Sequence, residues 1–73
     1  MKRFTVIYEK GENSWGAYVP DLPGVISVGD SREDVERLIQ EAIQFHLDGL
    51  RDEGLPIPNP SSFAGTVEVE TAA

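Results

Sequence analysis

The sequence predicts a small α+β domain of order β-β-β-α-β, with one long helix packed on one face of a mostly antiparallel sheet. Three short apolar or alternating segments precede residue 30, and such segments are typical of strands. A stretch of helical period follows, and a last alternating segment lies near the end of the chain. At 73 residues, the chain has room for a single domain, residues 1–73, with a small core.

The first two strands are predicted to form a hairpin. Residues 4–9 alternate in a strand-like way, and residues 10–14 are polar and turn-forming. Residues 15–19 form the second strand, which places Trp15 and Tyr18 on opposite faces.

A stiff turn separates the second strand from the third. Pro20 ends the second strand because proline has no N–H to donate to the ladder. In the turn formed by residues 20–24, Gly24 can adopt a positive φ angle. Residues 25–28 are then predicted to form a short third strand.

Residues 31–54 predict the long helix. Ser31 is a suitable N-cap, since its hydroxyl can accept the backbone N–H of Asp34. Gly54 can take the left-handed conformation that ends a helix, and Pro56 prevents continuation. The predicted apolar face consists of Val35, Leu38, Ile39, Ala42, His46, Gly49 and Leu50.

The remainder of the chain predicts an extended segment and a fourth strand. Alternating prolines in residues 55–62 favour polyproline-like geometry. Residues 66–70 alternate, and we expect Val67 and Val69 to point inward.

Charge and composition narrow the possible functions. Six basic and 13 acidic residues give a net charge of -7, which opposes nucleic-acid binding and suits either a basic partner protein or simple solubility. The absence of cysteine excludes disulfides and thiolate metal sites. No apolar run is long enough for a signal peptide or a membrane span, so we expect a cytoplasmic protein without membrane contact.

Few residues are candidates for catalysis. Asp21, Asp30 and Asp34 could contribute to a metal site, but turn and helix-start positions explain them as structural residues. His46 could be a general base, but the spacing fixes no nucleophile or carboxylate beside it, which favours a core or interface role. We therefore predict no catalytic residue, no metal, no cofactor and no enzyme activity.

Partner binding is the more favoured role. The candidate partner-binding or self-binding residues are Trp15, Tyr18, Asp21, Phe45 and Leu47. Aromatic side chains often anchor interfaces, although Trp15 and Tyr18 fit a core role equally well. Phe45 and Leu47 widen the apolar surface of the helix, which fits either a partner contact or wide burial against the sheet. A small core and open sheet edges also favour a homo-oligomer, most simply a dimer.

Four segments together resemble the HicB-like family, the antitoxin half of a bacterial toxin–antitoxin pair. They are YVPDLPG at residues 18–24, GDS at 29–31, LRDEG at 50–54 and IPNP at 57–60. The family pattern has these segments in the same order, so the resemblance covers nearly the whole chain. One departure is Val25, since the family often has cysteine at this position.

The resemblance implies a partial ribonuclease-H-like fold without ribonuclease activity. It also implies binding to a small, basic, RNA-cleaving toxin of the HicA type, although orphan members exist. Many members continue into a DNA-binding domain, for which 73 residues leave no room, so operator binding is not expected. The alternatives are a metal-dependent nuclease remnant and a purely structural homo-oligomer.

Overall fold

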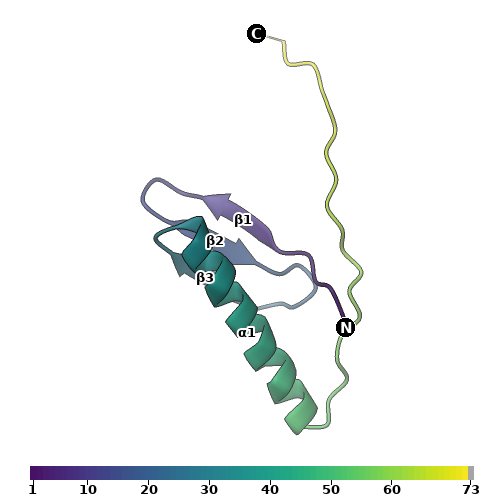
Figure 1. Ribbon diagram of the computed structural model, residues 1–73. Coiled ribbons are helices and arrows are strands. Elements are labelled where there is room, and N and C mark those ends of the chain that lie inside the picture. The colour runs from purple at the N-terminus through teal and green to yellow at the C-terminus, as the bar shows by residue number, and fades with distance from the viewer. Residues whose placement is uncertain (73) are drawn as a thin grey trace.

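The computed structural model describes residues 1–72 and contains a three-stranded antiparallel sheet with one helix. The elements are β1 (Ile7–Lys10), β2 (Trp15–Tyr18), β3 (Ile26–Gly29) and α1 (Arg32–Asp52). The strands lie in the order β1-β2-β3, and α1 lies across one face of the sheet (Figure 1). The α+β class and the order of three strands followed by a helix are therefore confirmed.

The register of the strands sorts their side chains onto two faces. Ala17 pairs with Tyr8 and Ser27, and this row faces α1, since Ala17 is buried in the core. Tyr18 pairs with Ile26 in the next row, which points away from the helix. Ile26 is accordingly 66% exposed, whereas Ala17 is only 5% exposed.

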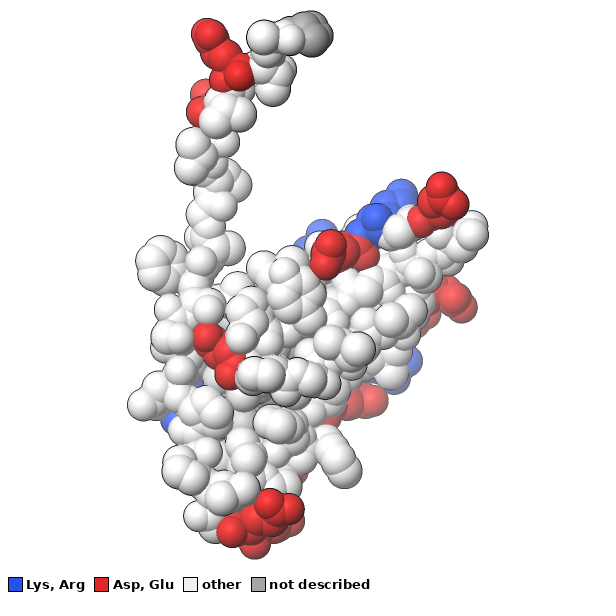
Figure 2. All heavy atoms as spheres, turned by 180° about the vertical axis from the view of Figure 1, so that it is seen from behind, with Lys and Arg blue, Asp and Glu red and all other residues white. Residues whose placement is uncertain are grey.

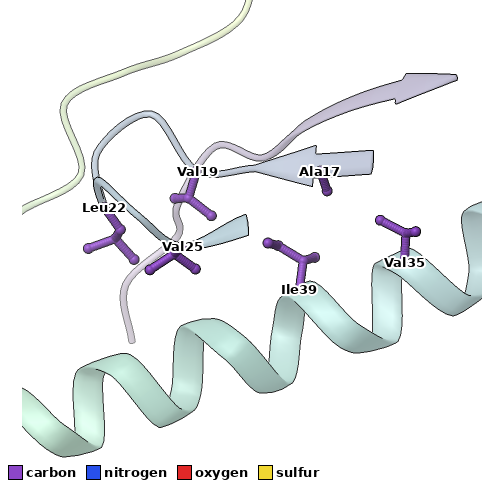
Figure 3. Close-up of a cluster of buried hydrophobic side chains, with 6 residues drawn as sticks. All are labelled: Ala17, Val19, Leu22, Val25, Val35 and Ile39. Atoms are coloured by element: carbon purple, nitrogen blue, oxygen red, sulfur yellow. The ribbon is translucent and has the colours of Figure 1, made fainter. Parts of the chain in front are cut away.

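The core forms between the sheet, the loop that joins β2 to β3, and the helix. Its buried side chains are Ala17, Val19, Leu22, Val25, Val35 and Ile39 (Figure 3). The loop closes on itself through backbone hydrogen bonds from Leu22 N–H to Val19 C=O and from Val25 N–H to Leu22 C=O, at 3.0 and 3.1 Å. The loop of residues 19–25, which contains the predicted turn, therefore supplies half of these core residues: Val19, Leu22 and Val25.

The apolar face of α1 follows a slightly different line from the predicted one. The residues that contact the core include a row spaced four apart: Val35, Ile39, Ile43 and Leu47. Such rows are inclined to the helix axis, so the contact drifts around the helix along its length. His46 and Gly49, which were placed on the core face, are instead half-exposed and exposed, respectively.

The ends of α1 agree with the prediction. Ser31 is the N-cap, and its Oγ accepts the Asp34 N–H at 3.1 Å. Replacing such a cap by alanine typically costs about 1 kcal/mol. Gly54 has a φ of 72°, the left-handed conformation that ends the helix. Gly24, with a φ of 86°, also has the expected positive angle.

The first strand is shorter than predicted. Residues 4–6 lie outside the ladder, although Phe4 and Val6 still pack against the core. The register pairs Ile7 with Tyr18, the last residue of β2, and Pro20 follows soon after. Residues before Ile7 therefore have no strand to pair with.

The predicted fourth strand at residues 66–70 is wrong for this structure. Residues 55–72 contain no strand or helix, and Val67 and Val69 are 85% and 75% exposed rather than inward. A strand requires a neighbour to receive its backbone hydrogen bonds. After Ser62 this part of the chain leads away from the sheet, so no neighbour is available (Figure 1).

Candidate functional site

The sheet presents apolar side chains on the face that α1 does not cover. We call this surface the open face, and it consists of Tyr18, Ile26 and Val28, which are 41%, 66% and 65% exposed. Viewed from behind the helix, the middle of the molecule is largely free of charged side chains (Figure 2). Contiguous exposed apolar side chains of this kind often mark an interaction site.

The backbone pairing explains why these three residues gather. Tyr18 lies directly opposite Ile26, and Val28 lies opposite Gly16 on the same side of the sheet. Because Gly16 has no side chain, nothing on β2 covers Val28 from across the strand. The open face is therefore flat enough for another protein surface to approach.

The helix carries a second exposed apolar region near its C-terminal end. Phe45 is 83% exposed beside a shallow hollow of about 230 Å³. The hollow is lined by Phe45, His46, Gly49, Leu50 and Glu53. Leu47 differs from Phe45, because it is half-buried and packs against the core, so only part of its surface is accessible to a partner.

Trp15 lies on the helix-facing side of β2, opposite in direction to Tyr18, as expected. It is half-buried and packs against the core. The Lys10 Nζ lies 6.0 Å from the centroid of its ring, at the outer limit of a cation–π contact. Tyr18 is thus the more accessible of the two aromatic candidates.

Asp21 is bound within its own chain rather than left free for a partner. Its Oδ2 accepts the backbone N–H groups of Ser61 and Ser62, each at 2.9 Å. Its Oδ1 accepts the hydroxyls of the same two serines at 3.0 and 2.8 Å. This single carboxylate therefore joins the β2–β3 loop to a segment 40 residues later in the sequence.

The segment that Asp21 holds, residues 55–62, is also attached to the N-terminus. We call it the exit segment. Thr5 donates its hydroxyl to the Ser62 C=O at 2.6 Å, and Lys2 Nζ donates to Asn59 Oδ1 at 2.9 Å. The IPNP motif therefore lies against the start of the chain, with Ile57 and Pro58 half-buried.

The hydrogen bonds lower the pKa of Asp21. The backbone N–H of Ser62 has the largest effect, followed by that of Ser61, and the pKa falls from 3.8 to about 2. Hydrogen bonds to a carboxylate favour its charged form. Because the pKa is lower in the folded state, the contribution of Asp21 to stability is present above pH 3.8 and is lost as the pH falls towards 2.

We predict that Asp21→Asn makes stability less dependent on pH between 4 and 2. The variant lacks the carboxylate whose protonation weakens the contact with Ser61 and Ser62. Urea-unfolding midpoints measured across this range should fall less steeply than in the unaltered chain. Asp52→Asn, which removes the same charge from an exposed helix position, should keep the original slope. Equal slopes for all three proteins would contradict the view that Asp21 causes this pH dependence.

The carboxylates considered for a metal site lie in separate settings. Asp21 is bound to the two serines, Asp34 follows the helix cap, and Asp30 is exposed. Within residues 1–72, no three His, Cys, Asp or Glu side chains are grouped closely enough to hold a metal ion. In the same range, no helix is long and apolar enough to cross a membrane.

Comparison with known proteins identifies the family. The model of the HicB-like antitoxin of bacterial toxin–antitoxin systems matches residues 4–71. The chain belongs to the HicB-like antitoxin family. The resemblance to this family, which four segments of the sequence first indicated, is therefore confirmed.

Curated relatives of this HicB-like chain differ in length. A protein named Antitoxin HicB 2 from Photorhabdus laumondii is 32% identical over 71 residues, which cover 97% of this chain and 50% of that protein. An uncharacterized 14.9 kDa protein from the rep-hol intergenic region of Haemophilus phage HP1 is 37% identical over 59 residues, or 78% of this chain and 44% of that protein. The chain thus spans about half the length of these two relatives.

A third relative has nearly the same length as this HicB-like chain. A UPF0150 protein from Helicobacter pylori is 37% identical over 67 residues, which cover 90% of this chain and 93% of that protein. No solved structure matches the chain at a significant level.

Proposed function

We propose that this HicB-like chain is a protein-interaction domain that binds and blocks a small, basic, RNA-cleaving toxin of the HicA type. The observation that carries the proposal is the open face, where Tyr18, Ile26 and Val28 are exposed without a covering layer. Membership of an antitoxin family supports this role. The name of the Photorhabdus laumondii relative, Antitoxin HicB 2, supports it as well.

The charge of the chain suits such a partner. A net charge of -7 attracts a basic protein over a distance of about one Debye length, roughly 8–10 Å at moderate salt. Apolar contact at the centre of the open face would then supply affinity, while charged residues around it guide approach. The proposed partner is therefore recognised by charge and apolar area together.

We further propose that the chain acts without catalysis, as a blocking protein in the cytoplasm. No group of side chains in residues 1–72 resembles a metal-dependent nuclease centre. The carboxylate with the most distinctive setting, Asp21, is fully engaged in holding the exit segment. A partial ribonuclease-H-like fold, which the family resemblance implies, stays a prediction.

We also propose that the chain forms a homodimer. Within residues 1–72, six side chains make up the buried core, and a chain this short has a small core. The outer edges of β1 and β3 have no strand beside them in the described part of the chain. Open strand edges are either protected or used for pairing, and a two-fold dimer is the commonest solution.

Toxin binding can be tested by calorimetric titration with an inactive form of a purified HicA-type toxin from the same genome. We expect saturable binding that Ile26→Glu abolishes, because the substitution places a charge in the middle of the open face. The matched control is Phe45→Glu, which places the same charge at an even more exposed apolar residue, on the helix. Its affinity should remain that of the unaltered chain.

Two outcomes would overturn this proposal. The first is the absence of binding by the unaltered chain under low-salt conditions. The second is loss of binding in Phe45→Glu with full binding in Ile26→Glu, which would place the contact on the helix. Circular dichroism of each variant verifies that α1 is retained.

A further inference from the structure

The residues after the exit segment form an arm that makes no sheet or helix of its own. We call residues 63–72 the C-terminal arm. It leads away from the rest of the molecule (Figure 1), and Phe63, Val67 and Val69 in it are 91%, 85% and 75% exposed. The radius of gyration is 14.9 Å, compared with about 11 Å for a compact chain of this length. The arm therefore exposes apolar side chains and unpaired backbone together.

The arm nevertheless carries the sequence of a strand. In residues 66–70, two valines alternate with two glutamates after a threonine. Alternation of this kind predicts a strand with one buried face, and valine and threonine favour extended backbone. The pattern is satisfied only when the segment lies beside another strand.

The chain's own β1 is poorly placed to receive this strand. Ser62 lies against Thr5, an offset of 57 residues, and the exit segment runs alongside the N-terminus in the same direction. Continuing at that offset would place residues 64–67 beside Ile7–Lys10, because 7 + 57 = 64 and 10 + 57 = 67. Most of the alternating segment would then lie beside the hairpin turn, where no strand edge exists.

Pairing with the β1 strand of a second copy is not restricted to this offset. Gly65 precedes the alternating segment, and among residues 1–72 no atom outside its two chain neighbours lies within 4 Å of the position where its side chain would be. The arm therefore leaves the body without a packing contact that fixes its direction at this point. Residues 66–70 of one copy can then align along the whole of a strand edge in another.

Of the two free edges, β1 suits the arm better. The arm carries Glu68 and Glu70, and at the β1 edge the exposed Lys10 balances the charge of its exposed neighbour Glu9. The edge at β3 is followed by three acidic residues and one basic residue, Asp30, Arg32, Glu33 and Asp34, and this net negative charge would repel the glutamates. Opposite charges across neighbouring strands stabilise pairing, and like charges weaken it. In Figure 2 the acidic side chains near the tip of the arm lie apart from the Lys and Arg side chains visible on the body of the molecule.

We propose that two copies exchange their arms, so that residues 66–70 of each add a strand to the β1 edge of the other. This inference rests on the dimer proposed above and specifies how it forms. Exchange in both directions is the reciprocal contact that a two-fold axis requires. It supplies neighbours for the arm's backbone and covers one open edge on each copy.

Sedimentation equilibrium of the full chain and of two proline variants tests the exchange. Successive N–H groups of a strand point to opposite edges, so either Val67→Pro or Glu68→Pro removes a ladder donor in any register. We expect a mass of about twice 8.0 kDa for the unaltered chain. Of the two proline variants, the one that removes a donor facing β1 should have a mass of 8.0 kDa. Thr71→Pro, outside the alternating segment, is the control and should remain dimeric.

The outcomes separate this inference from the dimer itself. If both proline variants remain dimeric, the exchange is wrong and another surface forms the dimer. If the unaltered chain is monomeric at micromolar concentration, both ideas are wrong. Hydrogen exchange adds a second measurement: amides 66–70 should be protected in the dimer and lose protection on dilution. Protection that does not depend on concentration would mean pairing within one chain and would overturn the exchange.

Discussion

Ile39→Ala is expected to destabilise the fold by about 2–5 kcal/mol, the range for truncating a buried isoleucine. Ile39 is 2% exposed and lies at the centre of the contact between α1 and the sheet (Figure 3). Alanine would leave a cavity that the short strands cannot close. Total stability is only about 0.05–0.15 kcal/mol per residue, so the loss is a large share of the whole.

Urea unfolding followed by helical circular dichroism measures this effect. Gln40→Ala is the matched control, since Gln40 is the next residue along α1 and is exposed. The free energy of unfolding of Gln40→Ala should stay within about 0.5 kcal/mol of that of the unaltered chain. An Ile39→Ala midpoint as high as that of the control would mean that the helix does not pack on the sheet as described.

The second large effect is expected for Leu22→Ala, in the loop between β2 and β3. Leu22 is 1% exposed, and its truncation should also cost about 2–5 kcal/mol. Its neighbour Asp21 holds Ser61 and Ser62, so disturbing the loop should also release the exit segment. We expect faster hydrogen exchange at the two serine amides as well as a lower unfolding midpoint.

The adjacent proline supplies the control for this prediction. Pro23 is exposed, and Pro23→Ala removes side-chain atoms from the same loop without opening the core. It should change the midpoint far less than Leu22→Ala does. Unchanged exchange at Ser61 and Ser62 in a destabilised Leu22→Ala protein would show that the loop and the exit segment are not coupled.

Local rules explain the parts of the fold that the sequence predicts well. Ser31, Gly24 and Gly54 each act within a few residues of their own positions, and each has the predicted conformation. The opposite orientations of Trp15 and Tyr18 likewise follow from the two-residue period of a strand. Such features need no knowledge of distant contacts.

The less predictable parts depend on contacts between distant residues. From its position in a turn, Asp21 is expected to form hydrogen bonds with nearby backbone. In the structure its four hydrogen bonds instead reach Ser61 and Ser62. A strand at residues 66–70 requires a neighbour that a single copy does not provide. In both cases the sequence indicates a capacity for hydrogen bonding without identifying the partner.

The open face was only partly predicted. Tyr18 was a candidate, but Ile26 and Val28 were not, because residues 25–28 were predicted only as a short strand whose two faces were not assigned. Alternation in β3 contained the missing signal, since Ser27 faces the helix and its two neighbours must point the other way. Pairing with Tyr18 then brings Ile26 into the same surface.

The two proposed contacts use different parts of the sheet. Arm exchange takes place along the β1 edge, whereas the open face lies on β2 and β3. A dimer formed in this way would leave Tyr18, Ile26 and Val28 on each copy accessible to a toxin. Whichever of Val67→Pro and Glu68→Pro disrupts the dimer is therefore expected to lower the mass of the assembly without abolishing toxin binding by the open face.

The central claim, that the chain blocks an RNA-cleaving toxin, is tested most directly by measuring RNA cleavage. A purified HicA-type toxin from the same genome is incubated with RNA and increasing amounts of the chain. We predict that cleavage stops near one chain per toxin and that Ile26→Glu restores it, while Phe45→Glu inhibits like the unaltered chain. Undiminished cleavage in the presence of a large excess of the unaltered chain would contradict the account.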